Sequence, residues 1–93
     1  MEIVLNKCFG GFSLSKSACE RLGIDDSDFY DEKEFRSSSR LVECVRALGD
    51  FANGDYAELE IVEIPSDVTD WEINDYDGAE SITYVLNGKL HHI

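Results

Sequence analysis

The feature that most constrains this chain is an apolar run that stops at a pair of glycines. Residues 3–5 are apolar and mostly β-branched, which is typical of a strand covered on both faces. Gly10 and Gly11 follow, and adjacent glycines indicate either a sharp turn or a close approach by another part of the chain. Phe9 and Phe12 flank the pair, and we expect them to pack this loop against the rest of the fold.

Two amphipathic segments after the glycines predict the helices. The first covers residues 15–22, where apolar residues recur every four positions and a glycine supplies the stop. The second and longer helix covers residues 39–52, capped by Ser38 or Ser39 and weakened by Gly49 in its interior. Its buried face is expected to carry Leu41, Val45 and Leu48.

Three segments in the second half of the chain have strand character. Residues 56–64 and 71–75 both alternate between apolar and polar side chains, so we expect them to pair as an antiparallel hairpin. Residues 80–86 are rich in β-branched side chains, and the Asn-Gly pair at 87–88 favours a short hairpin return. A helix is the alternative for this last segment.

These elements predict an α+β fold, in which a small, mostly antiparallel sheet of three or four strands has two helices packed on one side. Hydrophobic residues make up 43% of the chain, which is normal for a globular domain and argues against disorder. A chain of 93 residues is long enough for one modest core, so residues 1–93 are expected to form a single domain.

The chain is strongly acidic, with 20 acidic and 8 basic residues and a formal net charge of −12. This charge argues against direct, nonspecific binding of nucleic acid, which needs a basic surface, and against docking on an anionic membrane. Two interpretations stay open. The acidic surface is either simply solvated, which favours solubility, or it engages a basic partner, such as a protein groove that normally holds nucleic acid.

The residues needed for catalysis, metal binding or cofactor binding do not gather in the sequence. Cys8, Cys19 and Cys44 lack the Cys-x-x-Cys spacing of a zinc site, and their odd number without a signal peptide points to a reducing cytosol. A nucleophilic cysteine would need a base, and the two histidines stand at positions 91 and 92. No nucleotide-binding motif and no apolar stretch long enough for a bilayer is present. We therefore expect no metal, cofactor or membrane insertion, and rank an enzyme last.

One candidate site is the glycine loop itself, as an anion-binding nest formed by backbone N–H groups and the N-terminus of the first helix. A tight strand-to-helix turn with ordinary capping is the favoured alternative. Two arginines either supply charge to an anion bound there or pair with acidic residues on the surface. The residues assigned to this site are Gly10, Gly11, Phe12, Ser13, Ser15, Arg36 and Arg40.

Two acidic segments are candidate partner surfaces. The polar stretch over residues 24–39 predicts a long loop with at most a helical turn, whose aromatic residues either anchor it to the core or contact a partner. The turn at residues 77–78 gathers carboxylates that suit turn formation, cation binding or acid–base catalysis, of which turn formation is favoured. The assigned residues are Asp26, Asp28, Phe29, Tyr30, Asp31 and Glu32 in the first surface, and Asp75, Tyr76, Asp77 and Glu80 in the second.

The sequence also resembles a family of small bacteriophage and prophage proteins. The resemblance covers nearly the whole chain and rests on residues 3–15 (IVLNKCFGGFSLS), 48–49, 52–54, 61–65 (IVEIP) and 71–80 (WEINDYDGAE). It implies a phage origin and a setting in the cytoplasm of a bacterial host, and it implies no particular reaction. Relatives often finish with a basic and aromatic segment, whereas this chain finishes NGKLHHI, so a function of that tail is not expected to carry over.

The resemblance and the acidity together lead to a hypothesis of binding rather than catalysis. Small acidic phage proteins without a catalytic constellation often disable a bacterial defence by direct contact. The leading hypothesis is therefore a non-enzymatic accessory protein that inhibits a basic, nucleic-acid-handling host protein, for example as an anti-CRISPR that binds a CRISPR effector. The alternative is a small-ligand module whose glycine loop binds or sequesters phosphate or a nucleotide. A hydrolytic enzyme ranks below both.

Overall fold

The computed structural model describes residues 1–25 and 32–93, and within them the predicted α+β class is confirmed. The helices are α1 (Lys16–Leu22), α2 (Lys33–Arg36), α3 (Ser39–Leu48) and the 3-10 helix η1 (Gly49–Ala52). The strands are β1 (Glu2–Asn6), β2 (Leu59–Glu63), β3 (Asp70–Tyr76), β4 (Ala79–Leu86) and β5 (Lys89–His92). They form one sheet of β1 and β2 and a second sheet in the order β3–β4–β5, both antiparallel.

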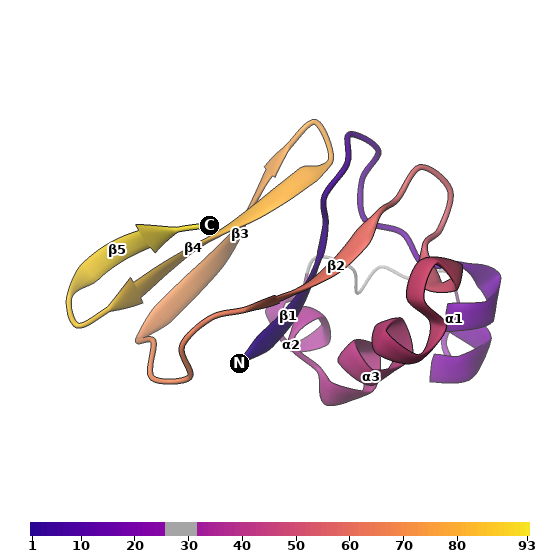
Figure 1. Ribbon diagram of the computed structural model, residues 1–93, viewed down its shortest axis with the longest axis horizontal. Helices are drawn as coiled ribbons and strands as arrows, with labels where there is room; N and C mark the ends of the chain where they lie inside the picture. Colours follow the sequence, from indigo (N-terminus) through magenta and orange to yellow (C-terminus); the bar gives the residue numbers. More distant parts are fainter. Residues whose placement is uncertain (26–31) are drawn as a thin grey trace.

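The β1–β2 sheet lies between the helices and the β3–β4–β5 sheet, so the elements stack in layers (Figure 1). Successive side chains of a strand point to opposite faces, and this alternation divides the core in two. Val4 and Ile61 face the helices, where they belong to the same apolar cluster as Leu41. Ile3 faces the other sheet, where it packs in a second cluster with Ile82.

β1 is the strand that both halves of the core share. Residues 3–5 are at most 1% exposed. This burial confirms the prediction of a strand covered on both faces. Helices α2 and α3 contact β1 from one side and β4 contacts it from the other.

The predicted hairpin between residues 56–64 and 71–75 is wrong. β2 pairs instead with β1, and β3 pairs with β4. A strand as buried as β1 needs a partner for its backbone groups, because unpaired N–H and C=O groups in a core are costly, and β2 supplies that partner. The β3–β4 connection is the two-residue turn Asp77-Gly78, with φ of 52° and 92°. Positive φ at both positions is the type I′ geometry that matches the twist of a hairpin.

The last part of the chain is strand, so the alternative of a helix there is wrong. β4 and β5 pair across the turn at residues 87–88, as the Asn-Gly signal predicts. Both turn residues again have positive φ, 52° and 73°. β3, β4 and β5 therefore form a simple meander with two tight turns.

The helices are close to their predicted positions, with one correction. α1 has Ser15 as its N-cap and Gly23 as its C-cap, with φ of 71° at the glycine. The predicted helix over residues 39–52 breaks at Gly49, the interior glycine that was expected to weaken it. α3 stops at Leu48, because Gly49 takes a φ of 56°, and the chain continues as η1. Of the expected core residues, Leu41 and Val45 are buried and Leu48 is half-buried.

Candidate functional site

Three loops that are distant in sequence meet at one end of the molecule, where their tips gather at the top of Figure 1. They are residues 7–13 between β1 and α1, residues 53–58 between η1 and β2, and residues 76–79, which turn from β3 into β4. We call these residues the three-loop end. The first two loops touch at Gly10, where a Cβ would stand only 2.7 Å from the Cβ of Tyr56. Only glycine permits this approach.

Gly78 brings the third loop against the first. Its φ is 92°, and a Cβ on it would lie 2.8 Å from the Gly10 nitrogen and closer still to the Gly11 nitrogen. The Gly10 amide itself donates to the Cys8 carbonyl at 3.0 Å. This geometry favours the tight-turn interpretation of the glycine pair over the anion-binding nest, because the Gly10 amide is already hydrogen-bonded and Gly78 packs closely against both nitrogens.

Asn6 joins all three loops through one buried side chain. Its Nδ2 donates to the Cys8 carbonyl at 2.8 Å and to the Gly78 carbonyl at 2.6 Å. Its Oδ1 accepts a hydrogen bond from the Glu58 amide at 2.8 Å. Each of these bonds reaches a different loop, so one side chain fixes the loops relative to each other. Sequence reasoning missed Asn6, for which the signal was a polar residue at the end of an otherwise apolar strand.

A buried ion pair lies beneath the three-loop end. The Arg36 guanidinium donates to the two carboxylate oxygens of Glu80 at 2.6 and 2.8 Å, and to the Val4 carbonyl at 3.2 Å. Glu80 also accepts from the Asn6 amide at 2.8 Å, and the guanidinium lies 3.7 Å from the centroid of the Phe12 ring. The Arg36 and Glu80 side chains are 1% and 4% exposed. Their predicted place among surface binding residues is therefore corrected, since both belong to the interior.

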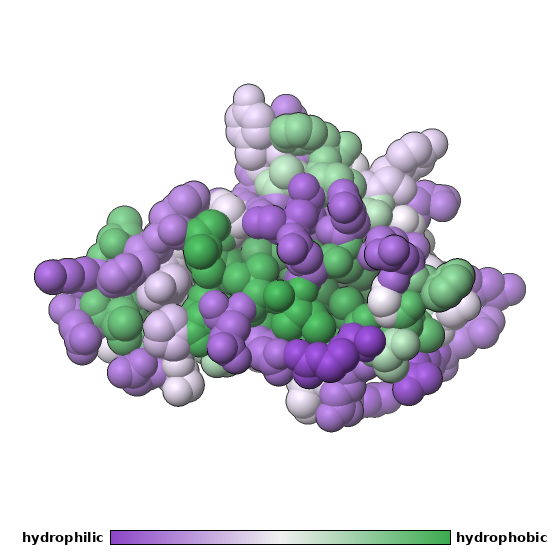
Figure 2. Space-filling model, in the orientation of Figure 1, coloured by the Kyte–Doolittle hydropathy of each residue, from purple (hydrophilic) through white to green (hydrophobic). Residues whose placement is uncertain are grey.

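Three aromatic side chains project from the three-loop end. Phe9, Tyr56 and Tyr76 are 74%, 86% and 74% exposed. The Phe9 and Tyr76 rings meet edge to face, with their centroids 6.4 Å apart. Figure 2 shows apolar and weakly polar side chains projecting at this end. The expectation that Phe9 packs its loop against the fold is thus wrong, whereas Phe12 is half-buried and packs against the helical core.

Tyr56 also holds an unfavourable backbone conformation. Its φ is 62°, in the left-handed region that costs an L-residue about 1–2 kcal/mol. Its carbonyl accepts a hydrogen bond from the Cys8 thiol at 3.0 Å, which helps to hold the loop in place. Burial of the ring does not offset this cost, because the ring is exposed. Strain at an exposed aromatic residue is typical of a functional position.

The two sites predicted separately, at the glycine loop and at the Asp77-Gly78 turn, are brought together into this single site. Ser13 donates to the Asp55 carbonyl at 3.1 Å, which links the first loop to the second. The Asp75 carboxylate accepts from the Gly78 amide at 2.7 Å. The Asp75 carboxylate therefore stabilises its own turn, as the favoured interpretation of that segment predicts.

The other predicted residues lie elsewhere. The Ser15 hydroxyl caps α1 and donates to the Phe51 carbonyl at 2.6 Å. Arg40 donates to the Leu22 carbonyl at 2.9 Å and so stabilises the end of α1 rather than the glycine loop. Glu32 is the exposed N-cap residue of α2. The residues that lie outside the described part of the chain are Asp26, Asp28, Phe29, Tyr30 and Asp31.

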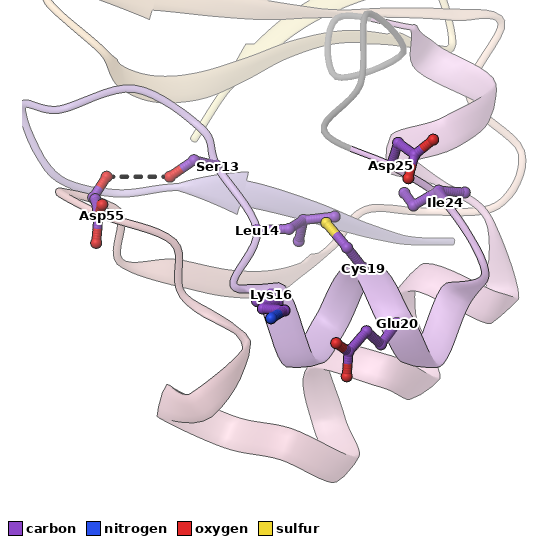
Figure 3. A pocket seen from close by; sticks show the side chains of 8 residues that line it. All are labelled: Ser13, Leu14, Lys16, Cys19, Glu20, Ile24, Asp25 and Asp55. Atoms are coloured by element: carbon purple, nitrogen blue, oxygen red, sulfur yellow. Dashed lines mark hydrogen bonds between the residues drawn. The ribbon is translucent and has the colours of Figure 1, made fainter.

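A surface pocket of about 520 Å³ opens beside α1, next to the three-loop end (Figure 3). Its lining includes Lys16 and the carboxylates of Glu20, Asp25 and Asp55. Three carboxylates to one amine disfavour an anion such as phosphate there. Over residues 1–25 and 32–93, no group of three His, Cys, Asp or Glu side chains is placed to hold a metal ion.

A comparison of this chain with protein-family models, curated proteins and solved structures finds no match. None of the helices in the described ranges is long and apolar enough to cross a membrane. The chemistry and shape of the three-loop end are therefore the basis for inferring a function.

Proposed function

We propose that this protein acts by binding another protein through the three-loop end, as a non-enzymatic inhibitor. The observation that supports this proposal best is the set of three exposed aromatic side chains, Phe9, Tyr56 and Tyr76. Binding energy at protein interfaces concentrates in a few such side chains surrounded by polar groups. An exposed aromatic cluster of this kind contributes little to the core of its own chain.

The base that carries these side chains is well fixed. The Asn6 side-chain amide forms hydrogen bonds with all three loops, and the ion pair of Arg36 and Glu80 lies directly below. Loops that are already ordered lose little conformational freedom on binding, so more of the contact energy becomes affinity. A rigid base beneath exposed aromatic rings thus favours a preformed recognition surface over an adaptable one.

The charge of the chain favours a basic partner. The net charge is −12, and complementary charge mainly accelerates association. With the resemblance to phage proteins, this leads us to propose a basic, nucleic-acid-handling protein of the bacterial host as the partner, for example a CRISPR effector in the host cytoplasm. The proposed role is inhibition of a host defence.

The first experiment captures host proteins on the full chain and measures the affinity of the partner for single variants. Tyr56→Ala and Tyr76→Ala should each weaken binding by about fivefold or more, since truncating a central aromatic contact costs upwards of about 1 kcal/mol. Phe51→Ala is the matched control, because Phe51 is 80% exposed but lies on η1, outside the three-loop end. If Phe51→Ala weakens binding as much as Tyr56→Ala, the binding surface is not the three-loop end.

The second experiment tests the anti-defence role directly. Expression of the wild-type chain in a CRISPR-immune host should restore plaque formation by a targeted phage, and expression of Tyr56→Ala at an equal level should not. Equal plaque counts with and without expression of the wild-type chain would refute the anti-defence role.

The alternative function, binding of phosphate or a nucleotide by the glycine loop, is tested by amide chemical shifts. The packing of Gly78 against Gly10 and Gly11 leads us to expect unchanged shifts at these residues and at Ser13 in millimolar phosphate or ATP. Saturable shifts at the same amides would favour the ligand-binding module instead.

A further inference from the structure

We infer that the three-loop end recognises arginine side chains on its basic partner, an inference that rests on the proposed function and makes its partner more specific. Two properties of the surface lead to it: exposed aromatic faces, and carboxylates with little opposing positive charge. A guanidinium is the protein group that satisfies both at once, because it stacks on aromatic rings and donates several hydrogen bonds to carboxylates.

The carboxylates stand beside the aromatic rings. Asp55 and Asp77 are the immediate sequence neighbours of Tyr56 and Tyr76, and both are exposed. Lys7 is the only lysine or arginine within the three-loop end, whose residues are all described, and its Nζ turns back to the Glu80 carbonyl at 3.4 Å. A cation that approaches the rings therefore meets uncompensated negative charge.

The aromatic component is what distinguishes arginine from lysine. A guanidinium is planar and weakly hydrated, so it lies flat on a ring at a smaller desolvation cost than a compact, strongly hydrated ammonium group. The interior of the same chain contains this arrangement. The Arg36 guanidinium lies 3.7 Å from the Phe12 ring centroid while it binds the Glu80 carboxylate.

Exposed aromatic rings also stack with nucleic-acid bases, but that mode of binding needs a positively charged groove for the phosphates. The three-loop end carries the carboxylates of Asp55, Glu58 and Asp77 against one lysine. Its charge therefore opposes a phosphate backbone and favours a basic protein segment.

The test titrates the full chain with two peptides of equal charge, acetyl-(Gly-Arg)5-amide and acetyl-(Gly-Lys)5-amide, and measures both affinities by calorimetry. Both cations are attracted to an aromatic face, but the planar, weakly hydrated guanidinium gains more; a preference of about threefold at each of Tyr56 and Tyr76 predicts that the arginine peptide binds about tenfold more tightly. Amide shifts at Phe9, Tyr56 and Tyr76 should locate the binding. Tyr56→Leu keeps an apolar side chain but removes the ring, and should reduce the preference to about threefold. Phe51→Leu should leave it unchanged.

Three results would overturn the inference: equal affinities for the two peptides, no binding of the arginine peptide, or tighter binding of an oligothymidine than of the arginine peptide. Binding of the host partner by the same variants shows whether only the arginine preference fails or the proposed function fails as well. If Tyr56→Leu loses the partner but the peptides bind equally, the surface is correct and the preference for arginine is wrong. If Tyr56→Leu and Tyr76→Leu both keep the partner at wild-type affinity, the proposed function itself is wrong.

Discussion

Arg36 and Glu80 meet through two parallel hydrogen bonds in the interior, although 44 residues separate them in the sequence. Arg36 ends α2, on the helical side of β1, and Glu80 lies in β4, on the opposite side. The pair therefore fastens the outer layers of the fold to each other across an edge of the central sheet. Glu80 lies two residues after Gly78, so the ion pair lies at the base of the Asp77-Gly78 turn.

Removal of one partner of this pair should be severely destabilising. Arg36→Met leaves the Glu80 carboxylate buried without its cation, which typically costs about 3–5 kcal/mol. Urea melts followed by circular dichroism measure the loss. The control is Lys33→Met, which breaks the ion pair of Lys33 with Asp70, whose side chains are 43% and 65% exposed. Solvent screens an exposed pair, so it contributes little to stability, and similar losses in the two variants would contradict the role of the buried pair.

The two hairpin glycines should differ sharply in their tolerance of a side chain. Gly78→Ala combines the left-handed backbone cost of about 1–2 kcal/mol with overpacking against Gly10 and Gly11 of about 1–3 kcal/mol. Gly88→Ala has a similar φ of 73°, but its Cβ would point into open space, so only the backbone cost applies. The free energies of unfolding of both variants decide the matter, and a Gly88→Ala loss equal to that of Gly78→Ala would disprove the tight packing of the loops.

Tyr56 should be a position where the native residue lowers stability. Asparagine tolerates the left-handed region better than tyrosine, so Tyr56→Asn should match the wild-type free energy of unfolding or exceed it by up to about 1 kcal/mol. Phe51→Asn is the control, because Phe51 is a similarly exposed aromatic residue that does not have a positive φ. This variant should change the free energy of unfolding by less than about 0.5 kcal/mol. A clear loss of stability in Tyr56→Asn would show that the ring packs on its own chain.

The helical half of the core should respond to a cavity at Leu41. This side chain is fully buried, and Leu41→Ala should cost about 2–5 kcal/mol. Leu90→Ala is the control, since Leu90 is 73% exposed, and it should cost less than about 0.5 kcal/mol. Thermal and urea melts of the two variants, compared with the wild type, provide the measurement. A loss for Leu41→Ala as small as that for Leu90→Ala would refute the assigned helix face.

The three thiols should react at different rates with iodoacetamide. Burial raises the pKa of the Cys44 thiol, against a smaller opposing effect from the charge of Arg21. A raised pKa lowers the fraction of reactive thiolate at pH 8, so Cys44 should be alkylated more slowly than the half-buried Cys8 and Cys19. Mass spectrometry of timed samples gives the three rates, which should converge in concentrated urea. Fast labelling of Cys44 in the folded protein would contradict its burial.

Local signals in the sequence predicted local structure well. Ser15 and Gly23 cap the two ends of α1 in the structure, and the Asn-Gly pair at residues 87–88 forms the expected turn. These features depend on residues that are neighbours in the chain, so a short stretch contains the information. The pairing partner of β2 was not predicted correctly. Alternation of apolar and polar residues indicates which face of a strand is buried, but not which strand lies beside it.

The polar residues of the site were the hardest to place. Charged side chains are rarely buried, so Arg36 and Glu80 were expected at the surface. Their burial follows only when α2 and β4 deliver them to the same point beside β1. The exposure of Phe9 could not be predicted either. Phe9 is exposed because the other two loops leave its ring uncovered, and their positions depend on the tertiary structure. Tertiary neighbours decide such cases, and the sequence does not name them.

The position of β1 between two late partners has a consequence for how the chain folds as it is made. Asn6 bonds to Glu80 across 74 residues, and Met1 bonds to Ile64 across 63. Contacts of such long range are slow to form, and a nascent chain presents residues 3–5 to solvent and chaperones until β2 and β4 have been synthesised. The strand with the deepest burial thus stays exposed during synthesis until both of its partner strands have emerged.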